Sequence, residues 1–398
     1  MGVAVGIDVA KEFHWVCAID VTHSEVLVDR RVENRPHDVA ALIDELQTLG
    51  SERGGLRVGV DVVGGIAGLL CAMLLEAGIE VLHVPGLAVN RARQGTTGGE
   101  HKSDPRDAAV IADQVRHRRD LRPVGALSEL DAELRLLVGR RRELVTDQTR
   151  RISRLRDLLA SINPGLERIV DPTQKAGQQL LCRYVTPTEI RKAGRRRLIE
   201  HIARGGRIPR AHVEKLADGA LDAAKAQSVQ IPGERVAASL VRELALETAH
   251  SRARLSELDT ELQAALERHP DAALIASLPG MGATLTAEFI AEAGSIDRFV
   301  TPDRLAAAAG LAPVLKQSGK VRYLKRANTG NKTLKRVFFQ SAFCSLNHPA
   351  SRAFYARKRA ERKTHHQAII SLARRRVDVL HAMLRNRTPY EHRVARAA

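Results

Sequence analysis

The first 63 residues decide the fold of the N-terminal part of the chain. They contain three short apolar runs rich in β-branched residues, VAVGIDVA at 3–10, FHWVCAID at 13–20 and EVLVDRRV at 25–32. Runs of this length predict three consecutive strands. After Pro36, apolar residues at helical spacing predict a helix that ends at Gly50, and LRVGVDVV at 56–63 predicts a buried strand. The predicted order is therefore strand, strand, strand, helix, strand.

The pattern continues to about residue 120. A helix is predicted at 66–77, a short strand at IEVLHV (79–84) and a helix at about 104–117. Three antiparallel strands that lead into helix-linked parallel strands describe a ribonuclease H-like sheet. We therefore expect an α/β domain of this kind at residues 1–120.

The remainder of the chain has the pattern of long and short helices. Apolar residues at 127–169 follow an imperfect heptad seam, which Arg141 and Arg151 interrupt, and a second helical stretch covers 234–268. Two arrangements fit this pattern: a coiled coil between protomers, with the arginines weakening it or facing nucleic acid, or an antiparallel hairpin within one chain. Shorter helices are expected at 171–232. The composition changes after Pro270, which predicts a helical connector at 121–270 and a third, mostly helical domain at 271–398.

Charge is divided unevenly along the chain. The 398 residues include 63 Lys and Arg against 46 Asp and Glu, a net charge of +17 that favours polyanions, above all nucleic acid, as partners. Residues 1–120 carry a net charge of −5 and the rest carries +22. The tail from Ser351 alone carries +10, which predicts a helix that follows a nucleic-acid backbone. Chemistry and binding are thus expected in different parts of the chain.

Other compositional features exclude several classes of protein. Four widely separated cysteines without C-x-x-C spacing argue against a zinc site or a disulfide framework and fit a reducing cytoplasm. No apolar run approaches the roughly 18 residues that span a bilayer, and the first residues lack the pattern of a signal peptide. We expect a protein that is neither membrane-bound nor secreted.

Four carboxylates stand where an α/β sheet would gather them. Asp8 lies in the first strand, Asp61 ends the fourth, and Asp104 and Asp107 begin a helix. Carboxylate oxygens bind Mg²⁺, and a pair of such ions stabilises the entering and leaving oxygens of phosphoryl transfer. Asp104 before Pro105 is also the pattern of a helix N-cap with Asp107 at N3. The magnesium prediction therefore rests on the set of four.

Two segments of the third domain are candidates for nucleic-acid contact. SLPGMGATLTAEFIAEAG at 277–294 resembles a helix-hairpin-helix motif, in which Gly280 and Gly282 would let backbone N–H groups approach a phosphate; the alternative is an ordinary turn between helices. In KQSGKVRYLKRANTGNKTLKR at 316–336, Ser318 lies among cations in a predicted loop. A serine there usually belongs to a solvated turn that contacts phosphate, and nucleophilic attack is the second interpretation, with Ser341 and Tyr323 as the nearest substitutes. The cations expected to bind nucleic acid are Lys316, Lys320, Arg322, Lys325, Arg326, Lys332, Lys335 and Arg336.

The order of five motifs resembles one family. GIDVAK, GVDVVG, KSDPRDA, LPGMG and the run GLAP, QSGK, GNKTLKR are similar to those of the DEDD transposases of the IS-one-ten (IS110) insertion-sequence family, which are RNA-guided serine recombinases. The resemblance assigns 1–120 to a RuvC-like catalytic domain and about 271–360 to a transposase domain. Two features depart from the family: many members carry glutamate where this chain has Asp61, and 171–232 matches no motif.

The resemblance implies a composite active site. Asp8, Asp61, Asp104 and Asp107 would hold Mg²⁺, and Ser318 would attack DNA to form a phosphoseryl bond. A guide RNA made from the element's non-coding end would pair with donor and target DNA. The long helices predicted at 127–169 and 234–268 are expected to hold protomers together in a homo-oligomer, dimer or tetramer. We expect the protein in the bacterial cytoplasm, and on the nucleoid when it is bound to DNA.

Two other functions fit the same residues. A RuvC-like nuclease specific for DNA junctions would use the four acids and take water as its nucleophile. A non-catalytic nucleic-acid-binding protein would use the acids only structurally. Magnesium-dependent cleavage separates the last function from the first two, and a covalent protein–DNA adduct separates the recombinase from the nuclease.

Overall fold

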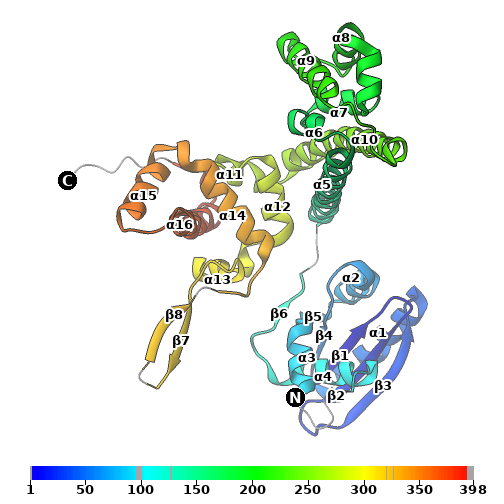
Figure 1. Cartoon of the computed structure of the whole chain (residues 1–398). Helices are drawn as coiled ribbons and strands as arrows, with labels where there is room; N and C mark the ends of the chain where they lie inside the picture. Colours follow the sequence, from blue (N-terminus) through cyan, green and yellow to red (C-terminus); the bar gives the residue numbers. More distant parts are fainter. Residues whose placement is uncertain (1, 96–100, 126–127, 320, 326, 392–398) are drawn as a thin grey trace, which may run out of the picture. The chain divides into compact units, whose positions relative to one another are not determined.

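The chain folds into two compact units in a computed structural model that describes residues 2–95, 101–125, 128–319, 321–325 and 327–391. The N-terminal unit is Met1–Leu127 and the C-terminal unit is Ser128–Ala398 (Figure 1). The further division of the C-terminal part at residue 270 stays a prediction. No described helix is long and apolar enough to cross a membrane.

The N-terminal unit is built on one mixed sheet. Its strands are β1 (Val3–Val9), β2 (Phe13–Asp20), β3 (Val26–Glu33), β4 (Leu56–Val60), β5 (Glu80–His83) and β6 (Arg122–Pro123). Its helices are α1 (Pro36–Arg53), the 3₁₀ turn η1 (Gly65–Ala67), α2 (Gly68–Glu76), α3 (Gly86–Gln94) and α4 (Asp104–His117). The strand order is β3-β2-β1-β4-β5-β6, in which β1, β2 and β3 are antiparallel and β1, β4 and β5 are parallel. The predicted strand and helix order is confirmed, whereas α3 and β6 were not predicted.

The alternation of β1 separates the two faces of the sheet. Odd positions such as Val5 and Ile7 join α1 and α2 in one buried core. The even positions face α4 and are small: Ala4, Gly6 and then Asp8. The small side chains of Ala4 and Gly6 let α4 lie close to the sheet.

Two glycines bring α4 into contact with the sheet backbone. Gly6 of β1 and Gly59 of β4 are partners in the parallel register. A Cβ atom at Gly6 would lie 2.1 Å from the carbonyl oxygen of Ala108, and one at Gly59 would lie 2.3 Å from a methyl group of Val115. Only glycine fits at these positions. Because an aspartate follows each glycine two residues later, the same face carries the acids toward the start of α4.

The C-terminal unit is almost entirely helical. Its long helices are α5 (Glu129–Ile162) and α10 (Glu234–Arg268). Between them lie α6 (Pro164–Ile169), α7 (Lys175–Leu181), α8 (Pro187–Ala203) and α9 (Arg210–Ala226). After α10 follow α11 (Ala272–Ser277), α12 (Ala283–Ala293), η2 (Ile296–Arg298), α13 (Pro302–Ala308), α14 (Lys332–Cys344), η3 (Ser345–Asn347), α15 (Pro349–Ala360) and α16 (His365–Asn386). A hairpin of β7 (Val314–Ser318) and β8 (Val321–Lys325) is inserted before α14.

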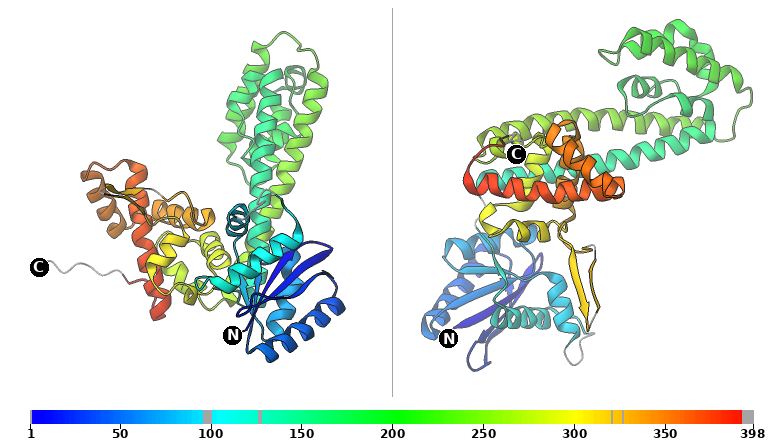
Figure 2. Two further views of the ribbon diagram at one scale, coloured as in Figure 1. Left: turned by 90° about the horizontal axis from the view of Figure 1, so that it is seen from below. Right: turned by 90° about the vertical axis from the view of Figure 1, so that its left-hand side faces the viewer.

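Helices α5 and α10 pair along their length within one chain (Figure 2). Arg141, predicted to weaken the seam or face nucleic acid, instead donates to Asp259 on α10. Arg151 likewise pairs with Glu247 on α10. The hairpin alternative is therefore confirmed. The interpretation of these arginines as nucleic-acid contacts was wrong, because they pair with acids of α10. The sequence did not show this pairing, since the acids lie about a hundred residues away. Assembly of protomers through these helices stays a prediction.

The paired helices connect two hydrophobic cores. One core joins the start of α5 and the end of α10 to α11–α16, and the other joins the end of α5 and the start of α10 to α6–α9. The predicted helix at 127–169 is interrupted at Asn163, whose buried side chain accepts from the Leu166 N–H and donates to the Val185 carbonyl. This cap and Pro164 start α6 as a separate helix.

Replacement of Gly6 tests the contact between α4 and the sheet. Gly6→Ala places a methyl group inside the backbone of α4, so we expect a loss of about 3 kcal/mol or more of unfolding free energy. Gly68→Ala is the matched control, because Gly68 has helical dihedrals and open space at its Cβ position. Urea unfolding of both variants measures the difference, and equal stability of the two would contradict the proposed packing.

Candidate active site

The register of the sheet places Asp8 beside Asp61. The last paired residues of β1 and β4 are Ile7 and Val60, so the next residue along each chain segment is one of the two acids. Asp104 and Asp107 lie in the first turns of α4, the helix that packs on β1. Asp61, Asp107 and Asp104 all contribute to the raised pKa of Asp8, so the four acids lie near one edge of the sheet. Their role as one metal site stays a prediction.

Burial and mutual repulsion raise the proton affinity of this cluster. The pKa of Asp8 is raised to about 7, first by burial and then by the charges of Asp61, Asp107 and Asp104. Burial also raises the pKa of Asp61. The backbone N–H groups of Val9 and Val62 hydrogen-bond to its carboxylate and partly offset this rise. Among the described residues, the Oδ1 atom of Asp61 is buried without a hydrogen-bond partner. Such an oxygen is open to a cation.

Asp107 forms an ion pair with an arginine side chain in this structure. The Nη1 atom of Arg93 on α3 lies 2.7 and 2.8 Å from the two carboxylate oxygens of Asp107, and Nη2 lies 2.8 Å from the Asn90 side-chain oxygen. The side chains of Arg93 and Asp107 are 12% and 7% exposed. Sequence analysis missed Arg93, since no spacing relates it to the acids and only the packing of α3 on α4 brings the two together.

One expectation about the start of α4 needs correction. Ser103, rather than Asp104, occupies the N-cap position, and no side chain caps the helix there. The structural interpretation of Asp104 as an N-cap is therefore wrong. Across the described chain, no three His, Cys, Asp or Glu side chains are grouped closely enough to surround an ion. Because like charges repel and Arg93 already binds Asp107, the acids are neighbours without forming a closed ligand set.

Ser318 lies at the end of β7, where a loop was predicted. Lys316 stands opposite Tyr323, and Ser318 stands opposite Val321, in a two-stranded ribbon whose described residues are all exposed. Gly319 follows with a φ of +53°, which suits a tight turn. The hydroxyl of Ser318 is therefore accessible on a narrow projection.

Of the two substitutes for Ser318, only one is accessible. Ser341 is fully buried and its hydroxyl accepts a hydrogen bond from Arg376. Tyr323 is 55% exposed on β8.

The predicted nucleic-acid contacts have different surroundings. On the ribbon, Lys316, Arg322 and Lys325 are exposed and have no acidic partner among the described residues. On α14, Lys332 is exposed and Lys335 is half-buried. Lys320 and Arg326 lie outside the described residues.

The two glycines of LPGMG also differ. Gly280 has a φ of +83°, and a Cβ atom there would lie 2.5 Å from the carbonyl oxygen of Ser341. The buried guanidinium of Arg376 binds the Pro279 carbonyl and the Ser341 hydroxyl, which holds this turn against α14. Packing therefore explains Gly280 without a ligand, whereas Gly282 begins α12 with open space around it. The helix-hairpin-helix assignment stays a prediction.

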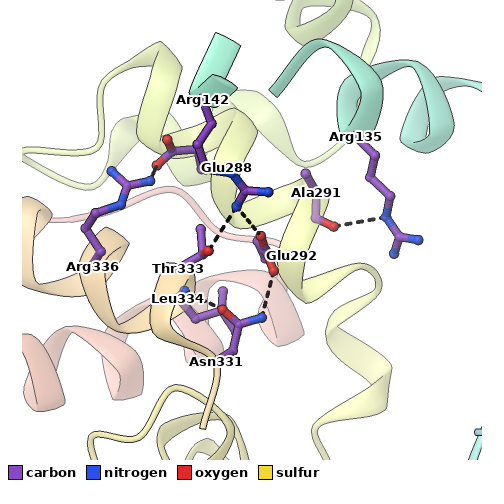
Figure 3. Close-up of polar contacts among 9 residues, drawn as sticks. All are labelled: Arg135, Arg142, Glu288, Ala291, Glu292, Asn331, Thr333, Leu334 and Arg336. Atoms are coloured by element: carbon purple, nitrogen blue, oxygen red, sulfur yellow. Dashed lines mark hydrogen bonds and ion pairs between the residues drawn. The ribbon is translucent and has the colours of Figure 1, made fainter. Parts of the chain in front are cut away.

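The GNKTLKR run is tied to α12 by a network of charges (Figure 3). Asn331 caps α14 through the Leu334 N–H and donates to Glu292, which also binds Arg142 of α5. Arg336, predicted to bind nucleic acid, pairs at 2.6 Å with the buried Glu288. This network fixes the base of the ribbon to the helices around it.

Comparisons with known proteins decide the family. A model described as Transposase (DEDD_Tnp_IS110) matches residues 5–164, and one described as Transposase IS116/IS110/IS902 family matches 272–356. The chain is 40% identical to the insertion element IS116 uncharacterized 44.8 kDa protein of Streptomyces clavuligerus, over 96% of this chain and 94% of that protein. It is 38% identical to the insertion element IS900 uncharacterized 42 kDa protein of Mycobacterium paratuberculosis, over 99% and 98%.

The chain belongs to the IS110 family of insertion-sequence transposases. A more distant similarity, 28% identity over 35% of this chain and 46% of the relative, links it to a pilin gene-inverting protein of Moraxella bovis. The matched region of the first model contains all four acids, and that of the second contains Gly280, Gly282 and Ser318. DNA is accordingly the substrate of this transposase.

The raised pKa of Asp8 predicts how stability depends on pH. Its pKa of about 7 in the folded chain exceeds the ordinary value of 3.8, so the ionised form is penalised by folding. Without divalent metal, Asp8→Asn should therefore stabilise the transposase at pH 8 by on the order of 2 kcal/mol, with the gain vanishing near pH 4. Thermal unfolding across this range, in a chelator, measures it. Asp44→Asn on the exposed side of α1 is the control, and a gain for Asp8→Asn that did not change with pH would contradict the assignment.

Proposed function

We propose that the chain is a recombinase that cleaves and rejoins DNA strands with Mg²⁺ and forms a phosphoseryl intermediate through Ser318. The observation that carries the proposal is the cluster of four acids. Burial and the charges of the other three raise the pKa of Asp8, and a buried oxygen of Asp61 has no described hydrogen-bond partner. The strand order β3-β2-β1-β4-β5, antiparallel and then parallel, supports a RuvC-like, ribonuclease H-like assignment for the N-terminal unit.

The donor set suits magnesium better than other metals. All four acids offer carboxylate oxygens, which hard divalent cations prefer, and no cysteine lies among them. Asp8, Asp61 and Asp104 would hold the ion, with Asp107 as the fourth ligand once Arg93 releases it. Asp61 is one methylene shorter than glutamate and retains the same ligand type. When bound, Mg²⁺ supplies positive charge to the oxygens of a phosphate under attack.

Ser318 would attack the phosphorus through its Oγ atom. The bond from phosphorus to one deoxyribose oxygen breaks, and that oxygen leaves with a proton from solvent while the serine proton passes to solvent. A serine phosphodiester retains the energy of the broken bond for rejoining. Because no histidine lies near Ser318 in the sequence, its activation depends on the acids of the N-terminal unit. Nucleic acid would have to bring the two units together, which protects the free protein from stray cleavage.

The remaining parts of the proposal concern partners. A guide RNA that pairs with donor and target DNA would relieve the protein of reading bases, and the charge of +22 beyond residue 120 supports a nucleic-acid-binding body. A dimer or tetramer is supported by apolar side chains that the α5–α10 pair leaves exposed, such as Leu136 at 76% and Leu246 at 57%. We place its action in the bacterial cytoplasm, on the nucleoid.

Removal of the Ser318 hydroxyl tests the intermediate. Ser318→Ala should leave DNA binding nearly unchanged, since the cations around it remain, and should abolish both strand cleavage and the protein-linked DNA band on a denaturing gel. Chelation of divalent metal should remove the same band from the parent protein. Gln317→Ala, the neighbouring ribbon residue on the opposite face, is the control and should retain the band.

The outcomes distinguish the three functions. Cleavage by Ser318→Ala at the parent rate would show that water is the nucleophile and that the chain is a RuvC-like junction nuclease. An adduct that persists in this variant would transfer the role to Tyr323. Absence of magnesium-dependent cleavage by the parent protein with its guide and DNA would leave only a nucleic-acid-binding function.

Arg93→Gln tests the metal site without cleavage. It removes the arginine that pairs with the buried Asp107 among the described residues, so the metal-free protein should lose on the order of 3 kcal/mol of stability. Magnesium should raise the melting temperature of this variant more than that of the parent, because the site has lost a competing positive charge. Arg30→Gln breaks an exposed pair with Glu45 and should show neither effect. If magnesium shifts no melting temperature, the metal assignment fails.

A further inference from the structure

Helix α15 packs on α16 (Figure 1). Three cations lie around the aromatic ring of Phe354 at this contact. The guanidinium carbon of Arg357 lies 5.1 Å from the ring centroid of Phe354, and that of Arg375 on α16 lies at the same distance. The Lys358 ammonium lies 5.6 Å from this centroid. The two guanidinium groups are consequently within about 10 Å of each other.

Acidic partners distinguish these cations from their neighbours. Lys358 is neutralised by Glu361, at 2.7 and 2.9 Å. On α16, Arg374 binds Asp303 and Asp378, and Arg385 binds Asp297. Arg357 and Arg375 are exposed, and neither has an acidic partner in the described part of the chain.

The ring fixes the direction of two unpaired positive charges. Phe354 is half-buried and packs against the main core of the C-terminal unit, so it is a rigid platform. An exposed cation–π contact is a weak attraction that biases a long side chain toward one orientation. It does not neutralise the charge. The arrangement therefore presents two oriented guanidinium forks with unsatisfied donors at one place on the surface.

We propose that Arg357 and Arg375 form a binding site for backbone phosphates of nucleic acid, with Phe354 as the positioning residue between them. Guanidinium forks match phosphate oxygens with two parallel hydrogen bonds, which ammonium groups do not. The ring is already flanked by cations, so it orients them and does not stack on a base. The site lies on the α15–α16 pair, separate in sequence from Ser318 and from the four acids, and it does not depend on cleavage. It gives the basic tail one defined contact.

Salt dependence of binding tests the number of phosphates held. Arg357→Gln/Arg375→Gln should reduce the slope of log K against log salt by about 1.8 on duplex DNA and about 1.4 on a single-stranded RNA. Measurement uses fluorescence anisotropy of the full chain with labelled DNA and RNA of equal length. The nucleic acid whose salt slope falls by the full expected amount is the one that occupies the site.

The control variant removes the same amount of charge from the same helix pair. Arg374→Gln/Arg385→Gln also lowers the net charge by two, but both arginines are paired with exposed acids, so the slope should change little. Phe354→Leu keeps an apolar side chain and all charges, and should weaken binding several-fold by freeing the guanidinium groups. Melting temperatures of all variants confirm folding before comparison.

The results distinguish a specific phosphate site from an effect of net charge alone. Equal slopes for the two double variants on both nucleic acids would overturn the proposal, because net charge alone would then explain the binding. Unchanged affinity in Phe354→Leu would overturn the positioning role. A reduced slope in a protein that shows no strand cleavage would uphold the phosphate site and count only against the recombinase proposal.

Discussion

The close contact between the α4 backbone and the sheet is the constraint on which the acidic site depends. Gly6 and Gly59 face each other across two parallel strands, and a side chain on either would push α4 away. The same alternation that puts these glycines under α4 puts an aspartate two residues later on the same face. The strands therefore end where α4 begins, and acids that are 96 residues apart in the sequence become electrostatic neighbours. The Gly-x-Asp pattern in both strands is thus one packing solution.

A second constraint organises the C-terminal unit. The pairing of α5 with α10 aligns arginines that interrupt an apolar seam with acids on the facing helix. Each arginine keeps its charge satisfied while its neighbours on the seam are buried. One end of the helix pair joins the core formed with α11–α16, and the other joins the core formed with α6–α9. The segment between α5 and α10 therefore has a core of its own, although it carries no motif.

The sequence predicts those features that depend on local pattern. The strands, α1, α4 and the residue types of the acidic cluster follow from periodicity and from the order of the motifs. Arg93 could not be found in this way, because its pairing with Asp107 depends on how α3 packs on α4. The heptad seam likewise fits a hairpin and a coiled coil equally, since the deciding partners Asp259 and Glu247 lie far along the chain. Gly280 was predicted to let the backbone approach a phosphate. Its positive φ and its close contact with the Ser341 backbone require glycine at this position without any ligand.

The ribbon shows a further limit of sequence patterns. An isolated pair of five-residue strands is marginally stable in water, and every described residue of β7 and β8 is exposed. Its base is fixed where Gly310 and Gly330 meet backbone to backbone and where Asn331 binds Ala308 and Glu292. The motif glycines and asparagine around Ser318 are therefore explained as the anchor of a projection.

Electrostatics gives a reason for keeping the two halves of the chemistry on separate units. A carboxylate cluster repels a phosphodiester, and the part of the chain that carries it has a net charge of −5, so it does not attract DNA by itself. The part beyond residue 120, at +22, has the charge that favours DNA, and its described cations without an acidic partner include those of the ribbon and those at Phe354. A divalent cation changes the sign of the interaction at the acids. Under the proposed mechanism, cleavage would require both a metal-loaded cluster and DNA held by the other unit, and neither unit would meet both conditions alone.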